Sequence, residues 1–129
     1  MAHYSLLITS SPFDQTSGTS PIEFAQALNE ADHTLDQIFF YQAGVYHANE
    51  FAHEPGNQSN QYQRWVELKA QLDVPLWVCV TAAAKRGVIS EHEAQELGKS
   101  GFNIAAPFEQ VGIGEFFAKL HQSDHLVQF

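Results

Sequence analysis

The sequence predicts an α/β protein built on a mainly parallel five-stranded sheet. Short runs rich in β-branched and aromatic residues alternate along the chain with segments of helical periodicity, as in parallel sheets whose strands are joined by helices. Residues 74–80 are apolar throughout, which is typical of a central strand covered on both faces. A chain of 129 residues, 44% of them hydrophobic, can bury one core of ordinary size. We therefore predict a single domain, residues 1–129.

Capping residues and hydrophobic runs predict where the helices and strands begin and end. Two capping boxes are predicted, Ser20 with Glu23 and Ser90 with Glu93, and a helical pattern follows each of them. Strands are predicted at residues 3–9, 34–41, 74–80, 102–105 and 125–127, and helices at 21–31, 60–72, 81–86, 91–97 and 114–122. The polar segment 44–60 is predicted to be the longest loop. Five strands with intervening helices predict a flavodoxin-like three-layer sandwich.

Charge and cysteine content restrict the function. Fifteen acidic and six basic residues give a formal charge of −9, which disfavours direct binding to nucleic acid. The longest apolar run near the start is only three residues, too short for a signal peptide or a membrane span. A single cysteine cannot form an internal disulfide and is safest in a reducing compartment. These observations predict a cytoplasmic protein that binds neither nucleic acid nor membrane.

The single cysteine, Cys79, is the candidate catalytic residue. It is predicted at the carboxyl end of the third strand, the edge of a parallel sheet where ligands and chemistry gather. If residues 81–86 form a helical turn, the N–H groups at its start, near Thr81 and Ala82, and the charges of Lys85 and Arg86 favour the thiolate form of the sulfur. A thiolate can take the terminal sulfur of a donor persulfide and pass it on by the same exchange. This chemistry requires no metal and no organic cofactor, and the absence of a second thiol prevents loss of the sulfur through a disulfide.

Three other interpretations remain open. A lone cysteine in an apolar strand is commonly a small buried hydrophobe, and the chain would then be a non-catalytic scaffold subunit. A cysteine-dependent phosphatase needs a glycine-rich loop and an arginine six positions after the cysteine, whereas this chain has Lys85 there and no glycine between. The Ser- and Thr-rich loop 10–20 follows the first strand, where a flavodoxin-like protein binds flavin phosphate, but it contains one glycine only.

Apolar residues also suggest an oligomer. Phe116 and Phe117 are adjacent on the last predicted helix and cannot both face one core. One of them is therefore expected to lie on the surface, where it would be available to a partner subunit.

Three segments together resemble the TusD-type members of the DsrE/DsrF-like sulfur-relay family. They are FFYQAGVYHAN (residues 39–49), VCVTAAAKRGV (residues 78–88) and LVQF (residues 126–129), and with their spacing they extend the resemblance over essentially the whole chain. The resemblance implies a flavodoxin-like sandwich in a heterohexamer with TusB-like and TusC-like subunits. It also implies that the cysteine matched by Cys79 receives persulfide sulfur from a TusA-like donor and passes it to a TusE-like acceptor, for 2-thiouridine at the tRNA wobble position. DsrE-type members of the family act instead in sulfur oxidation.

Overall fold

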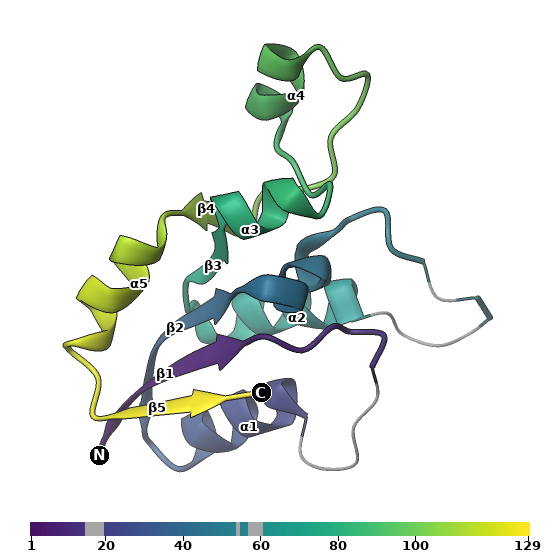
Figure 1. Ribbon diagram of the computed structural model, residues 1–129. Coiled ribbons are helices and arrows are strands. Elements are labelled where there is room, and N and C mark those ends of the chain that lie inside the picture. The colour runs from purple at the N-terminus through teal and green to yellow at the C-terminus, as the bar shows by residue number, and fades with distance from the viewer. Residues whose placement is uncertain (15–19, 54, 57–60) are drawn as a thin grey trace.

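The computed structural model describes residues 1–14, 20–53, 55–56 and 61–129, which form a five-stranded parallel sheet with flanking helices. The strands are β1 (His3–Ile8), β2 (Thr34–Phe40), β3 (Leu76–Cys79), β4 (Phe108–Val111) and β5 (His125–Gln128). Their order in the sheet is β4-β3-β2-β1-β5, and every neighbouring pair is parallel (Figure 1). The predicted α/β class is therefore confirmed. The chain runs outward from β1 to β4 and then crosses back, so that β5 lies on the other side of β1.

Helices cover both faces of the sheet and make it the middle of three layers. The helices are α1 (Pro21–Glu30), α2 (Gln61–Leu72), α3 (Val80–Lys85), α4 (Glu91–Leu97), α5 (Ile113–Leu120) and the 3-10 helix η1 (Gln42–Ala48). Side chains alternate between the two faces along β2, so Phe39 stacks on Phe116 of α5 at 4.7 Å between ring centroids, whereas Phe40 meets Trp65 of α2 edge-on at 5.0 Å. Among the described residues, no helix is both long and apolar enough to cross a membrane.

The helix starts follow the predicted capping residues. Ser90 Oγ accepts a hydrogen bond from the Glu93 N–H at 3.2 Å, and Glu93 Oε1 accepts one from the Ser90 N–H at 3.0 Å, which confirms that capping box. Ser20 also caps its helix, but its hydroxyl accepts from the Ile22 N–H at 3.2 Å. The predicted reciprocal pair with Glu23 is therefore replaced by a simpler N-cap.

The fourth strand does not lie where the sequence predicted it. Residues 102–105 are irregular, and β4 begins at Phe108. The reason is Asn103, a buried residue whose Oδ1 accepts from the Ile89 N–H at 2.8 Å and whose Nδ2 donates to the Gly87 carbonyl at 3.0 Å. These bonds tie the apolar segment to the loop after α3 rather than to β3, so Phe108, not residue 102, pairs with Leu76.

The start of the predicted long loop is instead the 3-10 helix η1. A side-chain carbon at Gly44 would overlap the Ile8 carbonyl oxygen and lie 2.7 Å from the carbonyl carbon, so only glycine allows η1 to approach β1 this closely. Val45 and Ala48, which belong to η1, are fully buried. Residues 54 and 57–60 of the predicted loop lie outside the described residues.

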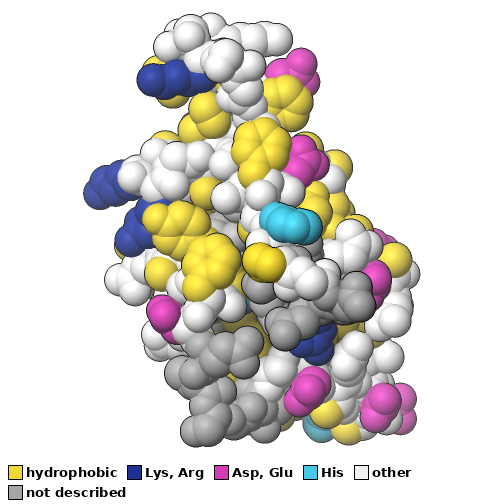
Figure 2. Space-filling model, turned by 90° about the vertical axis from the view of Figure 1, so that its right-hand side faces the viewer, with side chains coloured by type: hydrophobic (Ala, Val, Ile, Leu, Met, Phe, Trp, Pro, Cys, Tyr) yellow, Lys and Arg dark blue, Asp and Glu magenta, His cyan; other side chains and the backbone are white. Residues whose placement is uncertain are grey.

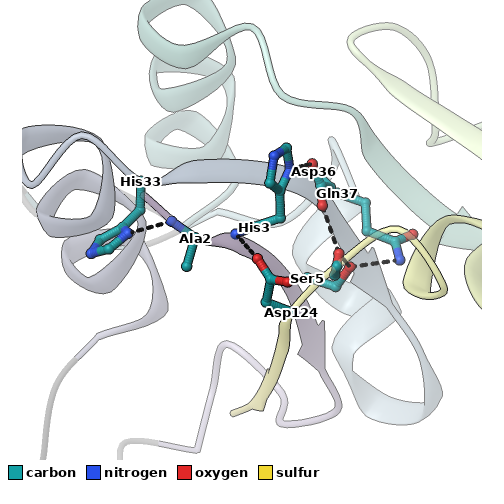
Figure 3. Close-up of polar contacts among 8 residues, drawn as sticks. Ala2, His3, Ser5, His33, Asp36, Gln37 and Asp124 are labelled. Atoms are coloured by element: carbon teal, nitrogen blue, oxygen red, sulfur yellow. Dashed lines mark hydrogen bonds and ion pairs between the residues drawn. The ribbon is translucent and has the colours of Figure 1, made fainter.

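A chain of polar side chains joins β1 and β2 to the segment that precedes β5 (Figure 3). Gln37 Nε2 donates to Ser5 Oγ at 3.0 Å, and the hydroxyls of Ser5 and Ser123 lie 2.7 Å apart. Ser123 Oγ then donates to Asp36 Oδ2 at 2.7 Å, and the other Asp36 oxygen lies 2.9 Å from His3 Nδ1. We call these five residues the amino-edge cluster, because they lie toward the amino ends of the strands.

Candidate functional site

Cys79 lies at the carboxyl edge of the sheet, opposite to the amino-edge cluster. It is the last residue of β3, beside Val111 of β4, and it is also the N-cap residue of α3. Its side chain makes no capping hydrogen bond, so the sulfur is not used to hold the helix start. The residue is 5% exposed and belongs to the hydrophobic core cluster. Position alone therefore fits both a reactive thiol and a buried structural one.

A cavity lies beside Cys79 at this edge of the sheet. Cys79 lines a cavity of about 450 Å³, together with Thr81, Ala82, Lys85 and Arg86. Thr81 and Lys85 are exposed, so this Cys79 cavity opens to solvent although the cysteine has little surface of its own. All four residues that the sequence placed near the sulfur are thus brought to the same cavity.

The basic residues of the cavity have different surroundings. Arg86 is half-buried, and its Nη1 donates to the Ala82 carbonyl at 3.1 Å, which fixes the guanidinium against the last turn of α3. Lys85 is exposed and has no ion-pair partner among the residues that the structure describes. One cation is therefore held in place and the other is free to turn toward a charged group in the cavity.

Three further residues of the cavity were missed by sequence reasoning. Tyr41 and Gln42 follow β2, and Ile113 begins α5 just after β4. They meet Cys79 because the carboxyl ends of parallel neighbours lie at one edge of the sheet. Gln42 has a φ of 52°, a left-handed conformation that is costly for a residue with a side chain. A listing of the residues that follow each strand would have found all three, once the strand order was known.

His47 lies outside the cavity and holds η1 in place. Its Nδ1 accepts from Trp65 Nε1 at 2.9 Å, so Nε2 carries the proton and donates to the Ser10 carbonyl at 3.0 Å. Burial lowers the pKa of His47 to about 4, against a smaller opposing effect of the Ser10 carbonyl. His47 is not among the residues that line the Cys79 cavity, and its neutral imidazole instead links η1 to α2 and to the segment after β1.

Comparison with known proteins places the chain in a family. The model of the DsrE/DsrF-like family matches residues 2–129. The chain belongs to the DsrE/DsrF-like family. Membership agrees with the resemblance seen in the three segments around residues 39–49, 78–88 and 126–129. The DsrE/DsrF-like fold carries Cys79 at the end of its third strand, inside the second of these segments.

Individual relatives of this DsrE/DsrF-like protein match it over nearly their whole length. Sulfurtransferase TusD of Proteus mirabilis is 36% identical over 126 residues, which are 98% of this chain and 97% of that protein. A sulfurtransferase TusD homolog of Vibrio cholerae is 39% identical over 127 residues, covering 98% of this chain and 96% of that protein. The crystal structure of the ychN protein from E. coli has the same fold, with a TM-score of 0.74, 20% identity and full coverage of both chains.

The loop considered for flavin phosphate is described only in part. Residues 15–19, which include its glycine, lie outside the described residues. Within the described part, the Ser10 carbonyl accepts from His47, and Ser11 Oγ accepts from the Phe13 N–H at 3.0 Å. The start of this loop is therefore tied to η1 and to itself.

Proposed function

We propose that this DsrE/DsrF-like protein is a cytoplasmic sulfurtransferase that carries sulfur as a persulfide on Cys79. The observation that carries the proposal is the position of the chain's only thiol, in the wall of a cavity that opens to solvent at the carboxyl edge of the sheet. Relatives that carry the name sulfurtransferase TusD, and that match nearly the whole chain, support the same activity.

The reaction consists of two exchanges at sulfur. In the first, the Cys79 thiolate attacks the terminal sulfur of a donor persulfide, a new S–S bond forms at Cys79, and the donor's S–S bond breaks to release the donor thiolate. In the second, an acceptor thiolate attacks the terminal sulfur on Cys79, and Cys79 leaves as a thiolate. No electron carrier is consumed, because the number of S–S bonds is conserved in each step.

The residues around Cys79 suit an anion at this position. The first backbone N–H groups of α3, near Thr81 and Ala82, have no acceptor within the helix, and Cys79 is the N-cap residue of this helix. Lys85 and Arg86 add positive charge to the wall of the same cavity. We assign to these four residues the stabilisation of the thiolate and of the terminal sulfur of the persulfide, which is also anionic.

The proposal extends to partners and pathway. We propose a heterohexamer with TusB-like and TusC-like subunits, a TusA-like donor, a TusE-like acceptor and tRNA wobble 2-thiouridine as the destination of the sulfur. Phe117 is half exposed on α5 next to the buried Phe116, as a surface that receives another subunit would be. Native mass measurement after co-expression with the two other subunits tests the assembly. Transfer to a sulfur-oxidation acceptor instead of the TusE-like protein would assign the chain to DsrE-type sulfur trafficking.

Mass spectrometry of the loaded protein tests the central step. The wild type is incubated with a cysteine desulfurase, cysteine and the TusA-like donor, and the intact mass is measured before and after reduction. We expect a gain of one sulfur atom that reduction reverses. The Cys79→Ser variant should gain none, and because Cys79 is the only cysteine, prior alkylation of the wild type is a matched control for the variant.

The alternative outcome would assign the chain a structural role. The low exposure of Cys79 is also what an inert, packed cysteine would show. If the wild type gains no sulfur while a loaded donor and the partner subunits are present, the chain is a scaffold subunit. Failure of a small alkylating agent to reach Cys79 in the folded protein would support the same conclusion.

A further inference from the structure

Three residues other than glycine have a left-handed backbone in the part of the chain that the structure describes. Asp32 (φ 62°) and Asp73 (φ 51°) lie just after the ends of α1 and α2. Helices commonly end with a residue in this conformation, and aspartate tolerates it better than most residues that have a side chain. Gln42 (φ 52°) has neither explanation, because it follows β2 and begins η1. Glycine would adopt the same conformation without the cost, so the fold alone gives no reason for a glutamine here.

Gln42 reaches the Cys79 cavity because β2 and β3 are parallel neighbours. Phe40 pairs with Val78, so the two chains leave the sheet side by side, one toward Gln42 and the other through Cys79 into α3. Both Gln42 and Cys79 line the cavity of about 450 Å³. Gln42 therefore brings a polar side chain to this cavity from the end of β2, whereas the two cations of the cavity come from α3 and the residue after it.

The side-chain amide of Gln42 is available for a ligand. The residue is exposed, and its side chain has no hydrogen-bond partner within residues 1–14, 20–53, 55–56 and 61–129. An amide has two N–H donors, and hydrogen bonds to an ionised acceptor are the strong ones. Figure 2 views the side toward which β1 and β2 point in Figure 1, and Lys and Arg side chains there lie beside hydrophobic ones. An anionic sulfur at this edge of the sheet would therefore meet both positive charge and an unused neutral donor.

We propose that the Gln42 amide donates a hydrogen bond to the terminal sulfur of the persulfide on Cys79. This inference rests on the proposed function, because the terminal sulfur is present only in the loaded protein. That sulfur lies one S–S bond, about 2 Å, beyond the cysteine sulfur. No covalent bond forms or breaks at Gln42. Its hydrogen bond stabilises the loaded state relative to the free thiolate and so keeps the sulfur on Cys79 until an acceptor arrives.

A persulfide buffer tests this role at equilibrium. The protein is incubated with a known ratio of glutathione persulfide to glutathione, and the intact mass gives the ratio of loaded to unloaded Cys79. One S–S bond forms at Cys79 for each one that breaks in glutathione persulfide. Gln42→Gly removes the amide together with the strained conformation, whereas Gln42→Glu keeps the side-chain length and the strain but has no donor when ionised. The ratio of loaded to unloaded protein should fall about tenfold in Gln42→Gly and at least as far in Gln42→Glu.

Stability and thiol reactivity separate this role from a structural one. The urea midpoint of Gln42→Gly should rise, because glycine adopts a φ of 52° without strain, although the same variant holds sulfur less well. The pH profile for alkylation of unloaded Cys79 by a small reagent should stay at the wild-type position. Asp32→Gly removes a left-handed side chain outside the cavity, so it should keep the wild-type ratio of loaded to unloaded protein.

Four outcomes would overturn the proposal. An unchanged ratio of loaded to unloaded protein in both Gln42 variants shows that the amide does not hold the sulfur. A lower ratio in Gln42→Glu alone assigns the effect to the added charge. A shift of the alkylation profile that accounts for the whole loss assigns Gln42 to the thiolate instead. If neither glutathione persulfide nor sodium polysulfide loads wild-type Cys79, the proposed function itself fails, and this inference fails with it.

Discussion

The two edges of the sheet use polar groups in opposite ways. At the amino edge, Gln37, Ser5, Ser123 and Asp36 bond to one another in a chain (Figure 3). At the carboxyl edge, the Cys79 sulfur makes no capping bond, Lys85 has no described ion-pair partner, and Gln42 adopts a left-handed backbone conformation. Hydrogen-bonded polar groups help to fix a unique structure. The amino edge is not free of unpaired groups or left-handed residues, because Gln37 Oε1 is buried without a hydrogen-bond partner and Asp32 has a φ of 62°. The difference is that side-chain hydrogen bonds at the amino edge join β1 and β2 to the segment before β5, whereas the carboxyl edge holds the cavity at which we propose the chemistry.

The largest effect is expected where η1 meets β1, since this contact shapes the carboxyl edge. Replacing Gly44 by Ala places a carbon against the Ile8 carbonyl, and the backbone must move. We expect the free energy of unfolding in urea to fall by more than about 3 kcal/mol. The fraction that still folds should take up sulfur more slowly, because η1 carries Gln42 to the Cys79 cavity.

Gly114 provides the matched control for this substitution. It lies in α5, and a side-chain carbon there meets nothing within 4 Å, so Gly114→Ala should leave stability unchanged or raise it by up to about 1 kcal/mol. Equal urea midpoints for the two variants would show that η1 is not fixed by its approach to β1.

His47 makes the carboxyl edge sensitive to acid. Its pKa is lowered from 6.5 to about 4, so between these pH values the unfolded chain binds a proton that the folded chain excludes. The free energy of unfolding should therefore be fully retained above pH 6.5 and fall as the pH drops toward 4. The total change from this residue is about 3 kcal/mol, because each pKa unit corresponds to about 1.4 kcal/mol.

Urea midpoints measured across this pH range check the prediction. His47→Gln should be less stable than the wild type at neutral pH and should lose less stability on acidification. The exposed His53 offers a control, since His53→Gln should keep the wild-type pH dependence. If the urea midpoint of His47→Gln falls with decreasing pH as steeply as that of the wild type, other groups cause the loss of stability in acid.

Local sequence patterns predicted most of the helices and strands. They failed where the conformation of a segment depends on a contact with a residue far away in the sequence. Alternating strands and helices, the Ser90 capping box and the position of Cys79 all follow from short stretches of sequence. The helix η1 was missed, because a short 3-10 segment has no clear periodicity and depends on the contact between Gly44 and Ile8. The fourth strand was misplaced, because residues 102–105 are apolar enough for a strand but are held by the side chain of Asn103.

The sequence predicted the residues of the candidate site that follow Cys79 in the chain, but not those that come from neighbouring strands. Thr81, Ala82, Lys85 and Arg86 were identified because they follow Cys79 directly. The other residues of the cavity come from the ends of β2 and β4, and sequence patterns did not fix the order of the strands. Residues that reach a site from neighbouring strands become visible only when that order is known.

Breaking the amino-edge cluster should weaken the fold without changing the chemistry. Asp36→Ala leaves the Ser123 hydroxyl and the His3 ring without their acceptor, and we expect the free energy of unfolding to fall by about 2 kcal/mol. Sulfur uptake by Cys79 from polysulfide should keep its wild-type rate below the melting temperature. Asp14→Ala, at an exposed position, is a control that should stay within about 0.5 kcal/mol. Slower uptake in Asp36→Ala would contradict the separation of the two edges.

The smallest effect is a pH dependence of the amino edge that runs opposite to that of His47. The hydrogen bond to Asp36, its negative charge and that of Asp124 raise the pKa of His3 above 6.5. The stability that this pair contributes is therefore present below pH 6.5 and is lost as the pH rises through the raised pKa. The effect is small because the His3 side chain is 43% exposed and water screens the pair. An NMR titration of the His3 ring should show the raised pKa in the wild type and a lower one in Asp36→Asn. Equal values in the two proteins would show that the contact with Asp36 does not hold the proton on His3.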